Sequence, residues 1–128
     1  MANNLAKAEF WRDFILQRCR YPAVTRLEAQ FRDAVLHDFC QCWCNGFAVV
    51  PSPGTLPMAK AGAGGMVFEA SFPIDDAQTI EIALMTDDAG CLTYVDVTCV
   101  GNNFPVPDTI QMAGEISHLW VSDKLLIP

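Results

Sequence analysis

Three stretches of alternating apolar and polar residues constrain the fold of this chain more than any other feature. Residues 66–72, 79–85 and 91–100 place an apolar side chain at nearly every second position, which is the period of a β-strand with one buried face. Asp75-Asp76 and Asp87-Asp88-Ala89-Gly90 separate the stretches, and these residue types favour tight turns. Connections this short predict an antiparallel meander, to which residues 47–50 can add a fourth strand.

Two helical patterns precede the strands. Residues 5–19 repeat apolar side chains at helical spacing, and Asn3 or Asn4 can cap their start. Thr25-Arg26-Leu27-Glu28 fits a capping box, and the apolar stripe that follows predicts one helix over residues 26–44. Asp108 can begin a short C-terminal helix, and we expect the apolar tail 125–128 to dock on the body or on a partner.

These patterns predict an α+β fold, with two N-terminal helices packed on a three- to four-stranded antiparallel meander and a short C-terminal helix. A length of 128 residues indicates a single domain, 1–128. A hydrophobic content of 52% with 18% charged residues excludes an intrinsically disordered chain.

The location follows from segments that the sequence lacks. No apolar run approaches the roughly 20 residues that span a bilayer, and the first residues lack the basic-then-apolar pattern of a secretion signal. Six cysteines without such a signal predict reduced thiols. We therefore expect a cytoplasmic protein that does not bind a membrane.

Acidic residues are concentrated in the second part of the chain. Residues 1–45 hold six Lys or Arg against five Asp or Glu, whereas residues 46–128 hold two against ten, within a total net charge of −7. A field of one sign on part of a small protein repels nucleic acid and attracts cationic partners. The charge pattern thus favours a basic protein as partner.

Strand parity gathers three of these carboxylates on one surface. Glu69, Glu81 and Asp96 all lie on the face opposite the apolar one. Five uncharged residues share that face in the same parity: Val67, Ala83, Met85, Leu92 and Tyr94. The face can be a solvated sheet surface, a protein-binding patch made of Glu69, Glu81, Met85, Tyr94 and Asp96, or, if the sheet curls, a cavity for acid–base work or a cationic ligand.

A second candidate is the cluster Cys40-Gln41-Cys42-Trp43-Cys44. Three thiolates within five residues can hold a soft metal ion. On the predicted helix, however, Cys42 points away from Cys40 and Cys44, so we interpret the cysteines as small buried hydrophobic residues and predict no metal. His37 and His118 show no spacing that pairs them with a cysteine as catalytic base.

The glycine-rich stretch 61–65 lacks the Gly-Lys-Ser/Thr ending of a phosphate-binding loop and precedes a strand, so we interpret it as a flexible loop. The sequence therefore identifies no catalytic residue and no cofactor, and it favours a binding protein over an enzyme.

In size, acidity and α+β plan the chain resembles the immunity proteins of bacterial toxin systems. That resemblance implies a non-enzymatic antagonist of a basic bacterial protein, and it assigns no residue a role. Two other hypotheses stay open. One is a small-molecule-binding protein or enzyme of the NTF2-like kind, in which helices close a curled sheet over a pocket. The other is a homodimeric interaction domain that associates through a sheet edge or the apolar tail.

Overall fold

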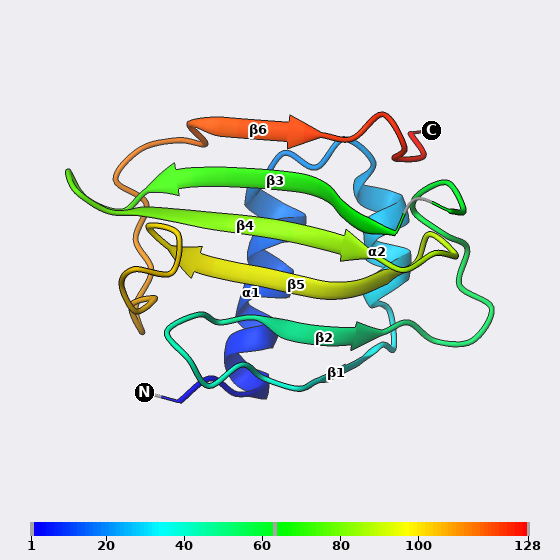
Figure 1. Cartoon of the computed structure of the whole chain (residues 1–128), viewed down its shortest axis with the longest axis horizontal. Helices are drawn as coiled ribbons and strands as arrows, with labels where there is room; N and C mark the ends of the chain where they lie inside the picture. The colour runs from blue at the N-terminus through cyan, green and yellow to red at the C-terminus, as the bar shows by residue number, and fades with distance from the viewer. Residues whose placement is uncertain (1, 63, 128) are drawn as a thin grey trace.

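The computed structural model describes residues 2–62 and 64–127, which form two helices and one six-stranded antiparallel sheet. The order of the strands in the sheet is β1-β2-β5-β4-β3-β6 (Figure 1). The elements are α1 (Leu5–Arg18), α2 (Val24–Phe31), β1 (Val35–His37), β2 (Phe47–Val50), β3 (Gly65–Pro73), β4 (Thr79–Thr86), β5 (Leu92–Cys99) and β6 (His118–Val121). The α+β prediction is confirmed, but the sheet has more strands than the three to four predicted.

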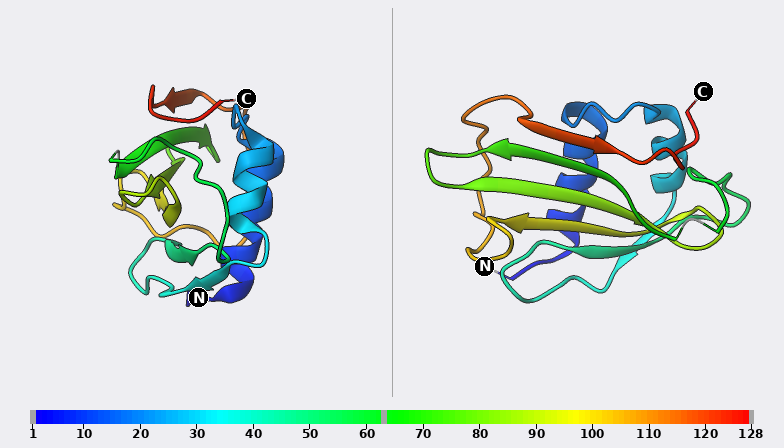
Figure 2. Two further views of the ribbon diagram at one scale, coloured as in Figure 1. Left: turned by 90° about the vertical axis from the view of Figure 1, so that its right-hand side faces the viewer. Right: turned by 45° about the horizontal axis from the view of Figure 1, so that its top comes forward.

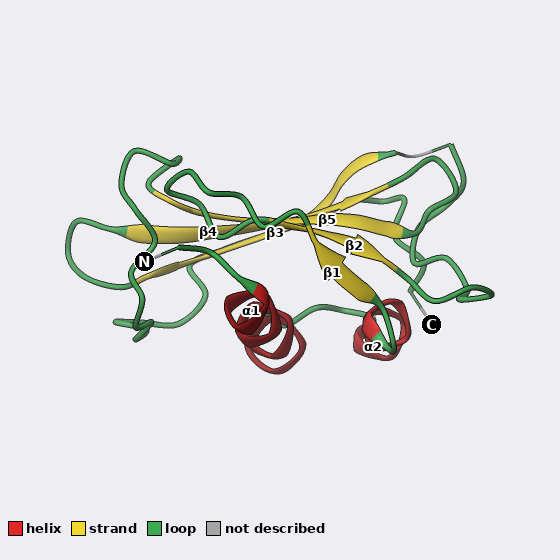
Figure 3. Ribbon diagram, turned by 90° about the horizontal axis from the view of Figure 1, so that it is seen from below, coloured by secondary structure: helices red, strands yellow, loops and turns green. Residues whose placement is uncertain are grey.

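Both helices cover the same face of the sheet, and the opposite face carries no helix among the described residues (Figures 2 and 3). The core lies between these layers. Trp11 and Ile15 of α1 and Leu27 of α2 are buried against the apolar side chains of the strands, and the Phe14 ring stacks on Phe72 with centroids 5.1 Å apart. Neither described helix combines the length and the apolar character needed to cross a bilayer.

The prediction of one helix over 26–44 is wrong. The helix runs from Val24 to Phe31, and Ala23 occupies the N-cap position without a side-chain hydrogen bond, so Thr25-Glu28 is not a capping box. Asp33 then adopts a left-handed backbone with φ 57°, which ends the helix, and Val35–His37 pairs with β2 as a hairpin. Backbone pairing with the sheet thus overrides the helical apolar pattern.

The predicted C-terminal helix is also absent from the described chain. Residues 108–117 are irregular, and their backbone N–H groups at Ala113 and Ser117 donate to Pro73 and Ser71 of β3. The segment then continues as β6, which pairs with β3. The predicted docking of the tail on the body is confirmed for the described residues, because Leu125 is buried and Leu126 N donates to Met58 O at 3.0 Å; Pro128 lies outside the described residues.

Two register shifts change which face Val67 and Leu92 occupy. Between β3 and β4 the register shifts between Met66 and Phe68, and between β4 and β5 it shifts next to Met85. Both Val67 and Leu92 are therefore buried, and the prediction that they share the carboxylate face is wrong. A β-bulge inserts one residue and reverses the parity beyond it.

A buried glutamine joins α2 to the rest of the fold. Gln30 is fully buried, its Nε2 donates to Leu56 O at 2.6 Å, and its Oε1 accepts from Leu92 N at 2.7 Å. The Leu92 N–H stands where the bulge interrupts the ladder, so the glutamine amide supplies a hydrogen bond that strand pairing does not. One side chain therefore fixes the helix, the 51–57 loop and the start of β5 together.

Replacing Gln30→Met should destabilise the fold while nearly conserving side-chain volume. It leaves the buried Leu92 N–H without its partner and removes the hydrogen bond to Leu56 O, so we expect the free energy of unfolding to fall by about 1–3 kcal/mol in urea titrations. Gln17→Met, at an exposed position on α1, is the matched control and should change it by less than about 0.5 kcal/mol. Equal effects of the two substitutions would contradict this role of Gln30.

Candidate functional site

The face of the sheet that the helices leave uncovered carries the residues predicted as a protein-binding patch. Glu69, Glu81, Met85, Tyr94 and Asp96 are all partly exposed, and in β4 and the central part of β5 the residues that alternate with them are buried in the core. The three carboxylates thus point away from the helices, as strand parity predicts. We call this surface the open face.

Cross-strand register fixes the spacing of the carboxylates. Glu69 pairs with Ala83, which pairs with Asp96 on its other side. Neighbouring strands lie about 4.8 Å apart, so the backbones of Glu69 and Asp96 are about 10 Å apart. In the described part of the chain no hydrogen bond joins the two carboxyl groups, and Glu69 contacts His118 instead.

Each carboxylate has a different environment. Glu69 Oε1 lies 3.0 Å from His118 Nε2. Glu81 Oε1 accepts from the Thr98 hydroxyl at 3.1 Å and from Gly101 N at 2.7 Å. Burial raises the pKa of Asp96, a rise partly offset by a hydrogen bond from the Val97 backbone, and no ion pair among the described residues involves it.

Positive charge is segregated from this face. None of the six strands contains Lys or Arg, whereas α1 and α2 carry Lys7, Arg12, Arg18 and Arg26. Apolar side chains are exposed on the strands: Val35, Val50, Met66 and Trp120 are each at least 40% accessible. The open face therefore combines carboxylates that have no Lys or Arg partner among the described residues with an apolar rim.

Five grooves of the surface lie away from the three carboxylates. Five grooves found among residues 2–62 and 64–127 all have a wall formed by α1, by α2 or by residues that directly follow them. The largest of them measures about 420 Å³ and is lined by Thr25, Arg26, Ala29 and Leu56. None of the five is lined by Glu69, Glu81 or Asp96.

The second candidate site is the loop of residues 40–44, between β1 and β2. The Sγ atoms of Cys40 and Cys42 are 2.9 Å apart, those of Cys42 and Cys44 are 3.0 Å apart, and all three lie within 4.8 Å of one another. The prediction that Cys42 points away from the other two is wrong, because these residues lie in an irregular loop rather than a helix. Only Cys44 of the three is buried, so the interpretation of all three as core hydrophobic residues fails as well.

Contacts within the cluster separate the acidities of its thiols. Hydrogen bonds with the Cys40 and Cys44 thiols and from the Cys44 backbone N–H lower the pKa of Cys42 to about 7, whereas burial raises the pKa of Cys44. Asn102 Nδ2 also lies 3.8 Å from Cys42 Sγ. Cys42 is the exposed member of the cluster, so its thiolate is available near neutral pH.

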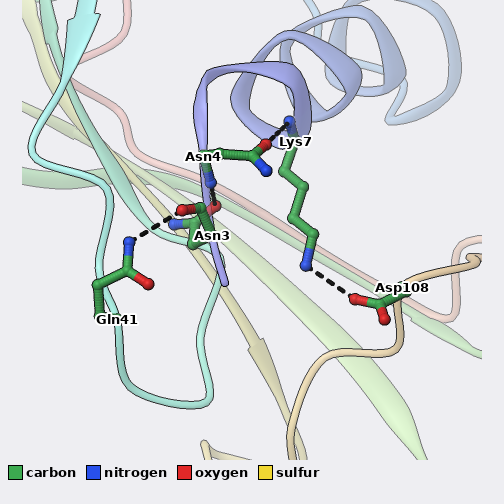
Figure 4. A network of polar contacts seen from close by, with 5 residues as sticks. All are labelled: Asn3, Asn4, Lys7, Gln41 and Asp108. Carbon is green, nitrogen blue, oxygen red and sulfur yellow. Dashed lines mark hydrogen bonds and ion pairs between the residues drawn. The ribbon is translucent and has the colours of Figure 1, made fainter. Parts of the chain in front are cut away.

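Asn3, just before α1, holds this cysteine loop in place, and the start of α1 is in turn tied to Asp108 (Figure 4). Asn3 is buried; its Nδ2 donates to Gly46 O at 2.8 Å, and its carbonyl accepts from Gln41 Nε2 at 2.9 Å. Asn4 caps α1 by accepting from Lys7 N, and Lys7 Nζ lies 2.8 Å from Asp108. The sequence singled out Asn3 only as a possible helix cap and gave no signal for Gln41, because only the tertiary fold brings residues 38 positions apart together.

Of the remaining sequence candidates, only His118 contacts a residue of either site among the described residues. His37 Nδ1 lies 3.3 Å from Asp38 and His118 contacts Glu69, and in the described part of the chain no contact of either histidine with a cysteine is found. The glycine-rich stretch 61–65 includes Ala63, which lies outside the described residues; Gly62 and Gly65 have positive φ values of 81° and 127°.

The raised pKa of Asp96 predicts a stability change with pH. Between the ordinary aspartate pKa and the raised value, the folded chain binds more protons than the unfolded chain, so this group makes stability fall as pH rises through that interval. Asp96→Asn should therefore raise the free energy of unfolding at pH 7. Below the ordinary aspartate pKa the variant should be no more stable than the parent, as measured by urea titrations at several pH values. Asp76→Asn, in an exposed turn, is the control; an Asp96→Asn protein less stable than the parent at pH 7 contradicts the assignment.

Cys42 should react as a thiolate with a midpoint near pH 7. Iodoacetamide labelling followed by peptide mass spectrometry measures its rate at each pH. Cys40→Ala removes the largest cause of the lowered pKa, and labelling of Cys42 at pH 7 should slow by about tenfold. Cys91→Ala, outside the cluster, should leave the pH dependence of Cys42 labelling unchanged. The same pH dependence in Cys40→Ala as in the parent would reject the hydrogen-bond explanation.

Comparison with known proteins assigns no role to the open face or to the cysteine loop. Searches against family models, against curated proteins and against solved structures each found no match. The roles considered below therefore rest on the residues, distances and charges described above.

Proposed function

We propose that this chain is a small non-enzymatic binding protein that uses the open face to engage a basic protein. The immunity-type antagonist of a basic bacterial protein is the form of this function that its size and acidity favour. In this proposal the protein acts in the cytoplasm, where its six free thiols stay reduced.

The observation that carries the proposal is Asp96. Its carboxylate is partly buried at the middle of the open face, its pKa is raised by that burial, and no ion pair among the described residues compensates it. Such a group is a cost to folding unless something else offsets it. A lysine or arginine of a partner would supply the missing positive charge and would be desolvated in the interface together with Asp96.

The surroundings of Asp96 support a protein as the partner. An exposed apolar rim of Val35, Val50, Met66 and Trp120 resembles the mixed apolar and charged composition of protein interfaces. The absence of Lys and Arg from all six strands disfavours nucleic acid, whose phosphates need cationic contacts.

A second copy of the chain is the alternative partner. Val35 and Val50 are 60% and 51% exposed beside the β1 edge of the sheet, and an exposed edge can pair with another chain. Light scattering at micromolar concentration distinguishes this homodimer from the monomer that the antagonist proposal uses.

The test measures association with purified small basic proteins of pI above about 9, beginning with products of genes adjacent to the one that encodes this chain. We expect fast association with at least one of them, falling steeply as salt is raised. Glu69→Lys should slow that association by about tenfold at low salt, because steering charges act mainly on the association rate.

Glu9→Lys is the matched control, since it makes the same change in net charge at an exposed position on the helical layer. Equal slowing by the two substitutions would mean that net charge rather than the open face steers binding. Association that does not depend on salt would also reject the proposal.

A further inference from the structure

The cysteine loop has the dimensions of a metal site. Metal–sulfur bonds of about 2.3 Å in a tetrahedral arrangement place sulfur atoms about 3.8 Å apart, and a trigonal arrangement places them about 4.0 Å apart. Cys42 Sγ lies 2.9 Å and 3.0 Å from the other two sulfurs, and all three lie within 4.8 Å of one another, so they are close enough to share one ion once the two short pairs widen. To reach either spacing, Cys42 Sγ has to move away from both neighbouring sulfurs by about 1 Å.

The loop that presents the thiols is already ordered by the rest of the fold. Cys40 N donates to Gly46 O at 2.9 Å, Trp43 O accepts from Val106 N at 3.0 Å, and Asn45 N donates to Val97 O at 2.9 Å. The Gln41 side chain is held by the carbonyls of Asn3 and Phe39. Because these contacts fix the backbone around all three cysteines, little ordering remains to be done when a ligand binds.

The thiol cluster is also accessible. Cys42 is exposed and Cys40 is partly exposed, whereas Cys44 lies at the buried side. An ion can therefore approach from solvent and meet the buried sulfur last. Trp43, which lies between Cys42 and Cys44 in the sequence, is itself 55% exposed.

We propose that Cys40, Cys42 and Cys44 bind one thiophilic metal ion with a filled d shell, and that three-coordinate Cu⁺ is the preferred occupant. Among the described residues, the group contains three sulfur ligands and no histidine or carboxylate. Soft thiolates select Cu⁺ and Zn²⁺, but structural Zn²⁺ sites almost always use four protein ligands. Binding releases the thiol protons to solvent, forms three metal–sulfur bonds and transfers no electron.

The test uses the full chain, reduced and kept without oxygen, with Cu⁺ supplied in competition with a chromophoric Cu⁺ chelator. We expect one Cu⁺ per chain by elemental analysis and protection of three cysteines from alkylation by mass spectrometry. Cys42→Ser removes an exposed ligand and should weaken binding by at least about 100-fold, since even the loss of an outer-shell partner costs 10–100-fold. Cys40→Ser should give the same loss.

Cys91→Ser is the matched control, because Cys91 is partly exposed but does not belong to the cluster; its affinity for Cu⁺ should equal that of the parent. Circular dichroism and the thermal midpoint show whether each variant is folded. Failure of the reduced chain to take Cu⁺ from the chelator, equal affinity in Cys42→Ser and parent, or retention of Zn²⁺ with exclusion of Cu⁺ would each overturn the proposal. These outcomes are independent of whether the open face binds a protein.

Discussion

The antiparallel pairing of β1 with β2 is the constraint on which the cysteine site depends, and it also completes one side of the sheet. Val35–His37 pairs with Ala48–Val50, and β2 in turn pairs with β5, so the hairpin extends the sheet beyond the meander. Without it, residues 32–46 have only their local preference, which favours a helix that scatters the cysteines around its axis. With it, residues 38–46 become a closed loop whose ends are fixed by the sheet.

The layering of helices on the sheet separates charge between the two faces. Once β1 and β2 join β3–β6, the sheet has one face covered by α1 and α2 and one face free of helices. The basic residues of the helices then stand on the covered side, and the carboxylates of Glu69, Glu81 and Asp96 on the other. The polarity of the molecule is therefore a consequence of helix-on-sheet layering combined with strands that contain no Lys or Arg.

Sequence reasoning succeeded where a single local period decided the structure. The helix at α1 and the core positions Ile80, Ile82, Leu84, Val95 and Val97 follow directly from spacing, and all five strand residues are fully buried. It failed at Val67 and Leu92, because a bulge is set by the register between two strands and not by either strand alone. It also failed at residues 32–44, where an apolar stripe at helical period coexists with cysteines at every second position. Alternation at every second position is the period of extended backbone, in which alternate side chains share a face. Only pairing with β2 decides between the helical and the extended conformation.

The place of the thiols relative to the core determines how metal binding and folding are connected. The core contains Trp11, Ile15, Phe47 and the strand interiors, but neither Cys40 nor Cys42. Zinc fingers fold only with their ion because the ion replaces a missing core, whereas this chain buries a continuous core between helices and sheet without the cysteine loop. Asn3 and Gln41 order that loop through hydrogen bonds, so the free energy of metal binding is not needed to fold the chain. The free energy of metal binding therefore contributes in full to the affinity for the ion, as expected for a site that can gain and lose its ion while the fold persists.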